Sequence, residues 1–333
     1  PDPLDLIAKY GADAVRLGML LCSSAGNDIL YDESQIEQGR NFNNKVWNAF
    51  RLVTGWNVDE AASQPEASAV AVKWFDNKLS QVIETVEDHF SKFRISDALM
   101  AIYKFFWDDF CAWYLEAVKP AYGAGIDKTT YEATIGFFDA LLKMIHPIMP
   151  FITEELWQNM AERKEGETIM NQRYPQAKPY DTEFITAFEM ACEAVAGVRN
   201  LRQSKNLSPR ESLDLKIKGA FPAEVLPVVV KLANVTVAEA EGDMSTAQRF
   251  MVRTVEMFVP LTGLINVEEE IAKLEAELAY QQKFLDSVRK KLSNERFVAN
   301  APEAVVAVER KKEADSLSKI ESITASLNAL KNN

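Results

Sequence analysis

The sequence predicts a mainly α-helical protein that combines a helical bundle, a small α/β domain and a C-terminal antiparallel coiled-coil hairpin. Three patterns support this fold class. Apolar residues recur at helical spacing through 34–175, strand-like alternation appears within 176–262, and a coiled-coil repeat occupies 263–333. A short helical junction, 1–33, precedes the bundle. At 333 residues the chain is long enough for two or three domains.

The junction has apolar residues near helical spacing from Leu4 onward, a break at Gly11 and a polar loop at 23–28. In the bundle, connectors rich in proline and glycine separate five expected helices. These helices are expected near 34–54, 68–91, 95–118, 129–146 and 151–163.

The following segment changes character, because strand-like runs appear after a helix near 182–203. Strands are expected at 213–217, 235–237 and 257–261, and an apolar stretch, Val225–Leu232, lies between the first two. A small α/β domain fits this order.

The tail consists almost entirely of residues that favour helices, and its apolar positions follow alternating steps of three and four. The first helix carries this seam at Ile271, Leu274, Leu278, Gln281, Leu285, Val288 and Leu292, and the second at Ile320, Ile323, Leu327 and Leu330. Ala299–Pro302 breaks the pattern once, and Lys311–Glu313 interrupts it with charge. One break between two helices predicts an antiparallel hairpin, and an arm of roughly 30 residues would be ~45 Å long.

The net charge of −12 argues against indiscriminate nucleic-acid binding. Local basic patches remain, such as 199–210, which holds four basic side chains and no acid. Three separated cysteines and two histidines predict neither disulfides nor a zinc site. With no apolar run long enough for a membrane span and no signal peptide at its start, the chain is expected to be cytoplasmic.

The helix at 38–54 has two contrasting faces. Phe42, Val46, Ala49, Phe50 and Val53 share one face, which is expected in the core. The opposite arc holds Arg40, Asn41, Asn44, Lys45, Asn48, Arg51 and Leu52. Such an arc is usually just hydrated, but its cations, amides and one apolar side chain also suit an unstacked RNA base.

Other conspicuous side chains have structural interpretations. Core positions are expected for Trp47, Trp107, Trp113 and Trp157, since each has apolar neighbours at helical spacing. His146 is expected to be structural. The adjacent acids Asp108–Asp109 and Glu154–Glu155 point to different helix faces and make poor acid/base pairs.

Four stretches resemble class I aminoacyl-tRNA synthetases of the valine, isoleucine and leucine group, and they fall in that family's order. They are Asp2-Pro3-Leu4 with Tyr10–Arg16, then Arg40–Ala49, Phe110–Glu116 and His146–Trp157. A fifth, Lys291–Glu303, is similar to the hairpin tip of valyl-tRNA synthetases. The zinc-binding cysteine cluster that usually ends an isoleucine enzyme is absent. The sequence therefore resembles the C-terminal part of a bacterial valyl-tRNA synthetase.

This resemblance implies three sets of tRNA contacts. The arc Arg40, Asn41, Asn44, Lys45, Asn48, Arg51 and Leu52 would meet the anticodon. Arg199, Arg202 and Lys205 would meet the tRNA backbone, or pack against the rest of the enzyme. A third set would meet the outer corner of the tRNA, namely Arg289, Lys290, Lys291, Arg296, Arg310, Lys311 and Lys312. Within 286–312 the sequence holds seven basic and four acidic side chains.

The resemblance also implies what this region lacks. The family's ATP-binding motif needs two histidines three apart, whereas His89 and His146 are 57 positions apart, and no Lys-Met-Ser-Lys-Ser occurs. No catalytic residue, metal or cofactor is therefore expected here, and ATP and magnesium would belong to the parent enzyme. Valine tRNA is the expected partner and a monomer the expected state. The alternatives are an isoleucyl-tRNA synthetase fragment and a helical scaffold whose coiled coil binds protein.

Overall fold

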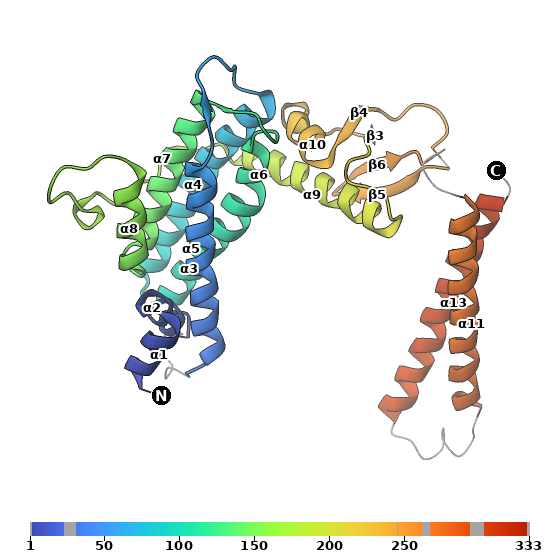
Figure 1. Ribbon diagram of the computed structural model, residues 1–333. Coiled ribbons are helices and arrows are strands. Elements are labelled where there is room, and N and C mark those ends of the chain that lie inside the picture. Colours follow the sequence, from blue (N-terminus) through green and yellow to red (C-terminus); the bar gives the residue numbers. More distant parts are fainter. Residues whose placement is uncertain (1, 23–30, 245, 262–266, 294–302, 332–333) are drawn as a thin grey trace. The chain divides into compact units, whose positions relative to one another are not determined.

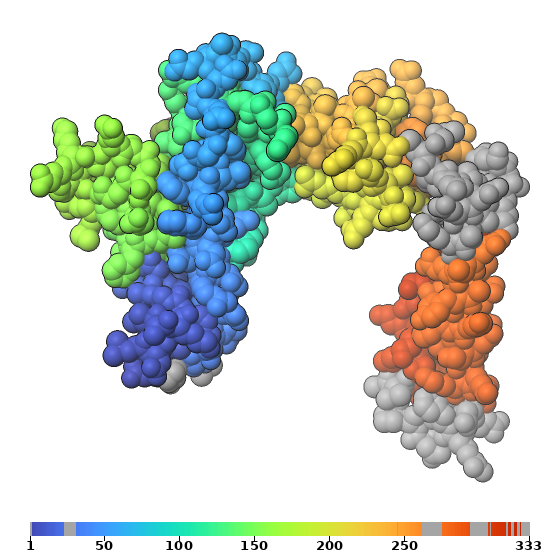
Figure 2. Space-filling view, viewed as in Figure 1, coloured from blue at the N-terminus to red at the C-terminus, as the bar shows by residue number. Residues whose placement is uncertain are grey.

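The computed structural model describes residues 2–22, 31–244, 246–261, 267–293 and 303–331 (Figure 1; space-filling view in Figure 2). The chain divides into two compact units. The first comprises Pro1–Asn200, Gly219–Val237 and Met251–Val255, and the second comprises Leu201–Lys218, Ala238–Phe250 and Glu256–Asn333.

The first unit begins with two short helices, α1 (Pro3–Tyr10) and α2 (Ala12–Leu21). The Asp2 carboxylate caps α1 by accepting a hydrogen bond from the backbone N–H of the helix's second residue at 2.8 Å. Gly11 adopts φ +87° and allows the sharp turn between the helices. The helical structure expected at the start of the chain and its break at Gly11 are confirmed, while the loop at 23–28 lies outside the described residues.

Helix α3 (Glu33–Thr54) packs unusually close to α2, because glycines occupy the contact points. A Cβ added to Gly18 would lie 2.6 Å from the Cα of Ile36. A Cβ added to Gly39 would lie 2.5 Å from the carbonyl oxygen of Ala14. Any side chain at either glycine would force the helices apart.

The remaining helices of the bundle follow the predicted positions closely. They are α4 (Glu66–Ser91), α5 (Ile95–Lys104), η1 (Phe105–Tyr114), α6 (Leu115–Val118), α7 (Lys128–Ile145) and α8 (Pro150–Met160), followed by the short turn η2 (Ile169–Asn171). The helix predicted at 95–118 is confirmed, and its middle ten residues form a π-helix, which was not predicted. Over so few residues, i→i+4 and i→i+5 hydrogen bonding leave similar apolar patterns, and periodicity does not separate them.

An aromatic cluster forms the core of this bundle. The Phe75 ring centroid lies 4.8 Å from those of Phe105 and Tyr114, 4.9 Å from Phe137 and 5.3 Å from Phe110. Each such pair contributes about 0.5–1.5 kcal/mol beyond the burial of its surface. Two short strands, β1 (Val58–Asp59) and β2 (Ile126–Asp127), pair in parallel.

A long helix, α9 (Thr182–Ser204), leads into a four-stranded sheet of order β4-β3-β6-β5. Its strands are β3 (Leu213–Lys218), β4 (Val235–Glu239), β5 (Gln248–Val252) and β6 (Val255–Val259). β3 pairs antiparallel with β6, with Ile217 opposite Met257. The apolar stretch between β3 and β4 forms η3 (Ala223–Val225) and α10 (Leu226–Ala233).

The predicted strands are confirmed, but β5 was not predicted. The turn from β5 to β6 contains Arg253 at φ +53°. Arginine is not typical of hairpin turns, so the sequence does not predict this one.

The arm consists of α11 (Val267–Leu292) and α13 (Glu303–Lys331), which lie side by side (Figure 1). Ion pairs join Arg289 to Glu313 and Lys291 to Glu309, so one residue number rises as the other falls, as an antiparallel pair requires. The predicted hairpin is confirmed.

Its seam buries Leu285, Val288, Val306, Ile323 and Leu327. The side chains of Ile271, Leu274 and Leu330, and the break at 299–302, lie outside the described residues.

The apolar seam is interrupted by polar side chains near Lys311–Glu313 as predicted, although the coiled-coil repeat itself continues. α13 is one helix across Lys311–Glu313. Its inward positions run from Val306 through Glu309 and Ser316 to Ile323 in steps that keep the coiled-coil repeat, and both polar side chains are buried. The seam is therefore continuous but partly polar.

Helix α4 ends in a left-handed turn at Phe93. The N–H of Arg94 donates to the carbonyl of His89 at 2.9 Å, and that of Phe93 to Phe90 at 3.0 Å, a Schellman motif. Glycine normally occupies the position of Phe93, which has φ +59°. The Phe93 side chain is 84% exposed, so burial does not offset its backbone strain.

Replacing this residue with glycine (Phe93→Gly) is expected to raise the free energy of unfolding by up to about 1 kcal/mol, because glycine adopts the left-handed region without a Cβ clash. Urea denaturation of the whole chain measures the change. Phe93→Ala is the matched control, since alanine removes the ring and keeps the strain. Equal midpoints for both variants and the parent chain would contradict this explanation.

Asp109 of η1 lies among charges from three helices: Lys78 of α4, its neighbour Asp108, and Glu189 of α9. Lys78 pairs with Glu189 at 3.3 Å. Burial raises the pKa of Asp109 to about 6, an effect that Lys78 opposes and the two acids reinforce.

Because the folded chain holds this proton more tightly than the unfolded chain, Asp109 should reduce stability as the pH rises from about 4 to about 6. Asp109→Asn is therefore expected to flatten the pH dependence of the free energy of unfolding in that window. Urea titrations at several pH values test this, with Asp108→Asn as the exposed control. Parallel profiles for Asp109→Asn and the parent chain would refute it.

Candidate nucleic-acid interface

The face of α3 opposite the core is exposed as the sequence predicts. Phe42, Val46, Ala49 and Val53 are buried. The Phe42 ring packs against those of Tyr103 and Phe106. The exposed or half-buried side chains of the arc are Arg40, Asn41, Asn44, Lys45, Asn48, Arg51 and Leu52. α3 thus brings together every residue predicted for this surface.

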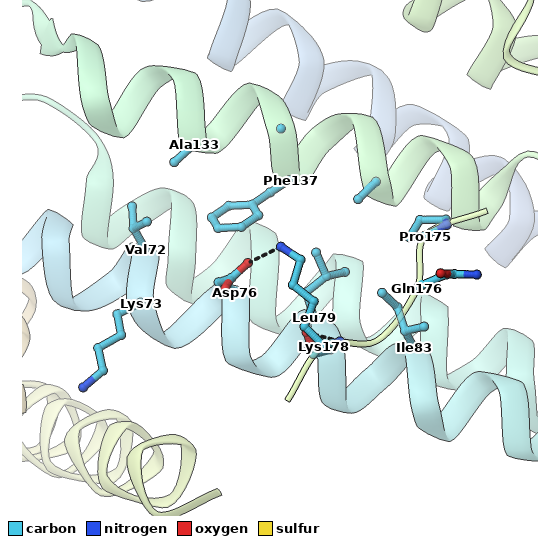
Figure 3. A pocket seen from close by; sticks show the side chains of 13 residues that line it. Val72, Lys73, Asp76, Leu79, Ile83, Ala133, Phe137, Pro175, Gln176 and Lys178 are labelled. Atoms are coloured by element: carbon cyan, nitrogen blue, oxygen red, sulfur yellow. Dashed lines mark hydrogen bonds and ion pairs between the residues drawn. The ribbon is translucent and has the colours of Figure 1, made fainter. Parts of the chain in front are cut away.

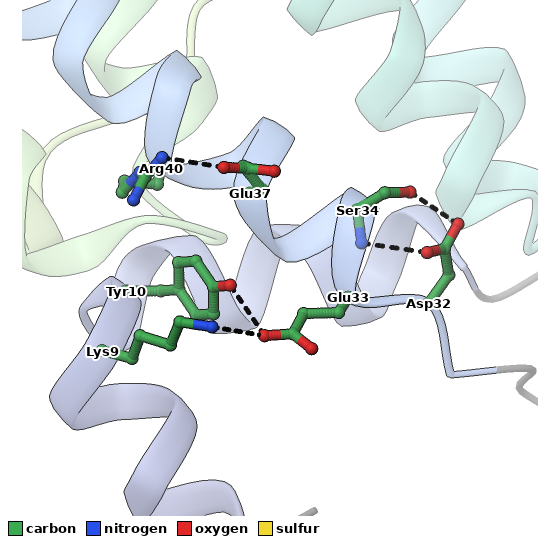
Figure 4. Close-up of polar contacts among 7 residues, drawn as sticks. All are labelled: Lys9, Tyr10, Asp32, Glu33, Ser34, Glu37 and Arg40. Carbon is green, nitrogen blue, oxygen red and sulfur yellow. Dashed lines mark hydrogen bonds and ion pairs between the residues drawn. The ribbon is translucent and has the colours of Figure 1, made fainter.

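Local contacts hold the first turns of α3 (Figure 4). Asp32 caps the helix, accepting from Ser34 N at 2.9 Å. Glu33 accepts from Lys9 Nζ at 2.8 Å and from the Tyr10 hydroxyl at 2.7 Å. The hydrogen bond from Lys9 lowers the pKa of Glu33. The junction helix α1 is thereby tied to α3.

The cations of the arc differ in how freely they present their charge. Arg40 pairs with Glu37 at 3.0 Å and lies 5.5 Å from the ring centroid of Tyr10. Lys45 is half-buried, with its Nζ 5.2 Å from the Trp107 ring. Arg51 is exposed and makes no ion pair within the described residues. Arg51 is therefore the arc's most available guanidinium.

Trp47 departs from the prediction. It was expected in the core, yet 42% of it is exposed, whereas Trp157 is buried and donates its Nε1 hydrogen to Asp139. Trp107 and Trp113 are half-buried. Trp47 lies between the polar arc and the core on the helix circumference, and its position there, rather than its hydropathy, decides its exposure. The sequence signal for its exposure is its spacing of about one helical turn from Asn44 and from Arg51, which both belong to the arc.

The three cations predicted to meet the tRNA backbone, near the end of α9, are not equivalent. Arg199, in the first unit, is exposed; it donates to the carbonyl of Leu232 and lies 5.7 Å from the Trp113 ring. Arg202, in the second unit, is only 5% exposed and donates to the Ser208 carbonyl at 2.7 Å. This burial corrects the prediction for Arg202, because a guanidinium satisfied inside the protein does not reach an RNA phosphate. Lys205 is half-buried.

The described cations near the hairpin tip fall into two groups. Arg289, Lys291 and Lys312 form ion pairs with Glu313 or Glu309 at 2.7–3.8 Å. Lys290, Arg310 and Lys311 are exposed and pair with no acid among the described residues. Arg296, the seventh predicted residue, lies outside them. Only the second group presents uncompensated charge.

Glu309 organises the first group from within the seam. It is 6% exposed, and Lys312 Nζ donates to it at 2.7 Å. Lys291 lies 3.8 Å from its other oxygen, within ion-pair range but too far for a hydrogen bond. The hydrogen bond from Lys312 lowers the pKa of Glu309.

A groove of about 600 Å³ lies between α4 and α7, beside residues 175–178 (Figure 3). Val72, Leu79, Ile83 and Phe137 give it apolar walls, and an ion pair between Asp76 and Lys178, 3.8 Å long, lies within it. Ser80 also lines it and accepts a hydrogen bond from the backbone N–H of Lys178 at 3.4 Å.

His146 and Glu154 both make structural hydrogen bonds. His146 Nδ1 lies 2.7 Å from the Thr153 hydroxyl. Glu154 accepts from Thr168 and from the backbone of Ile169, which fastens η2 to α8. In the described part of the chain, no group of three or more His, Cys, Asp or Glu is placed to hold a metal ion. No described helix is long and apolar enough to cross a membrane.

Two protein families match the chain. The anticodon-binding domain of tRNA ligase matches residues 72–217, and the valyl tRNA synthetase tRNA binding arm matches residues 266–331. The first range covers most of the bundle from α4 onward, and the second covers the hairpin. A solved LeuRS–tRNA–LeuAMS complex from Agrobacterium radiobacter K84 aligns with 56% of this chain and 21% of its own at 18% identity; its TM-score of 0.38 is too low to support an argument.

Proteins named valine–tRNA ligase match nearly the whole chain. Those of Parabacteroides distasonis and Phocaeicola vulgatus are 55% and 54% identical over 331 and 333 residues, covering 99% of this chain and 38% of their own. That of Bacillus licheniformis is 37% identical over 349 residues, covering 99% of this chain and 39% of its own. The chain therefore spans less than two fifths of the length of these relatives.

Proposed function

This chain belongs to the valine–tRNA ligase family, of which it carries the anticodon-binding domain and the tRNA-binding arm, and we propose that it holds and positions valine tRNA for the rest of the enzyme. The observation that carries the proposal is the arc on α3, which places three cations beside three amides in a protein of net charge −12. Clustered cations in an acidic protein favour a specific RNA contact over general attraction.

We assign anticodon contact to the arc on α3. Amide side chains hydrogen-bond to the edges of unstacked bases, and a guanidinium such as Arg51 pairs with a phosphate. The family match for the anticodon-binding domain begins at residue 72, after α3, so this assignment depends on the surface chemistry of the helix.

The exposed cations Lys290, Arg310 and Lys311 are assigned to the tRNA backbone at the outer corner. Their charge is not compensated by the described acids, and the arm has little core of its own to bury. Arg199 and Lys205 remain candidates for contact with the tRNA backbone. Arg202 is no longer a candidate, because it is buried.

The mechanism of this region is positional. Binding energy gathered at the anticodon and the outer corner would orient the acceptor end for a reaction elsewhere in the enzyme. Joining valine to tRNA, and handling the ATP and magnesium it requires, are proposed for the rest of the enzyme. The family's ATP-binding motifs do not occur in this sequence, and no group of described residues is placed to hold a metal ion. The remaining alternative is a hairpin that docks protein, which the salt dependence below tests.

Asn44→Ala is expected to weaken binding of valine tRNA about two- to tenfold, the loss of one hydrogen bond, and to do less to a tRNA with a replaced anticodon. Arg51→Ala should weaken both RNAs equally if it contacts phosphate. Filter binding with purified tRNAs measures both effects, and Asn171→Ala, an exposed amide outside α3, is the control. Unchanged affinity and discrimination in both variants would mean that the arc is only hydrated.

Replacing Lys290, Arg310 and Lys311 with alanine should reduce the slope of log affinity against log salt by up to ~0.7–0.9 for each phosphate that the arm no longer binds. Helicity by circular dichroism should hold, because these side chains lie outside the seam. The matched triple variant at Arg289, Lys291 and Lys312 should instead loosen the hairpin, since it removes the partners of Glu309. An unchanged salt slope in the variant at Lys290, Arg310 and Lys311 would favour protein docking by the arm.

A further inference from the structure

Four side chains of α3 form one row along the helix. Arg40, Asn44, Trp47 and Arg51 follow one another in steps of four, three and four, which places neighbours on the same face roughly one helical turn apart. Asn44 and Arg51 are exposed, and Arg40 is half-buried. An indole is thus flanked by an amide on one side and a guanidinium on the other.

The fold buries only part of the Trp47 indole. It is 42% exposed, while Trp74 and Trp157 are buried. Its aromatic contact is with Phe50, at a centroid distance of 6.4 Å and a tilt of 42°, so its faces are not stacked. Its Nε1 makes no hydrogen bond within the described residues. A large apolar ring left open beside polar groups is typical of recognition surfaces.

The chemistry of the row identifies its ligand. An aromatic face stacks on a base, an amide reads a base edge, and a guanidinium pairs with a phosphate. An apolar protein partner fits less well, because it would bury the Arg51 charge without compensation. The combination matches one unstacked base of a single-stranded RNA loop and the phosphate beside it.

We propose that Trp47 is the platform on which one unstacked anticodon-loop base stacks, with Asn44 at the edge of that base and Arg51 at its phosphate. This inference rests on the proposed anticodon contact of α3. It moves the stacking role away from Leu52, which lies five residues on and about 140° around the helix.

The test uses the whole chain and an RNA hairpin with the anticodon stem–loop of valine tRNA, with affinity measured by fluorescence anisotropy. Trp47→Leu, which keeps apolar bulk and loses the aromatic face, should weaken binding about 5- to 100-fold. Trp47→Phe should retain most of the affinity. Phe151→Leu, at an exposed aromatic residue of α8 outside the arc, is the matched control and should bind like the parent chain. Circular dichroism and urea midpoints establish that each variant is folded.

A second RNA set carries a single abasic nucleotide at each loop position in turn. At the position of the stacked base, Trp47→Leu should cause no further loss, because the stacking partner is already missing. If Trp47→Leu binds the intact loop like the parent chain while Arg51→Ala weakens it, Trp47 is not the platform and the proposed anticodon contact stands. If the parent chain fails to bind the hairpin, both proposals fail.

Discussion

The burial of one face of α3 in an aromatic core is the constraint on which the candidate interface depends. The Phe42 ring lies 4.8 Å from Tyr103, and the Phe50 ring 6.1 Å from Phe138. On the side of α2, Gly39 brings the two backbones into contact, so the helix has no room to rotate. The opposite row is therefore held in one orientation before any ligand arrives. A surface on a rigid helix loses little freedom on binding, and more of its contact energy remains for affinity and discrimination.

Sequence periodicity predicted the helices and the two faces of α3, because burial there follows angular position and residue type together. It was wrong at Trp47, where the two disagree: the residue is apolar but lies at the edge of the polar arc. It was also wrong for Arg202, whose guanidinium is buried and donates to the carbonyl of Ser208, six residues further along the chain. Neither the turn at Arg253 nor the π-helix has a residue signature. These features depend on backbone conformation, which residue type and apolar period do not encode.

Ion pairing determines which cations of this acidic protein are available. Arg40 and Arg289 each pair with a nearby glutamate, and Lys45 lies against an indole. Exposed pairs of this kind contribute little to stability, but they orient long side chains and offset their charge. A count of basic residues therefore overstates the positive surface. Arg51 on α3 and Lys290 on the arm carry their charge without such offsets among the described residues, and they belong to different compact units. The proposed roles therefore assign anticodon discrimination and general affinity for tRNA to different units.

The polar part of the arm's seam gives those outer cations a fixed position. A hairpin with an entirely apolar seam can slip by a heptad with little loss, whereas a polar residue in the seam favours one register at some cost in stability. Glu309 is buried there and meets Lys312 on its own helix and Lys291 on the other. A slipped register would leave its carboxylate buried without the partner from α11, which is strongly unfavourable. The same carboxylate that weakens the seam thus sets the alignment of α11 with α13, and with it the spacing of Lys290 from Arg310 and Lys311.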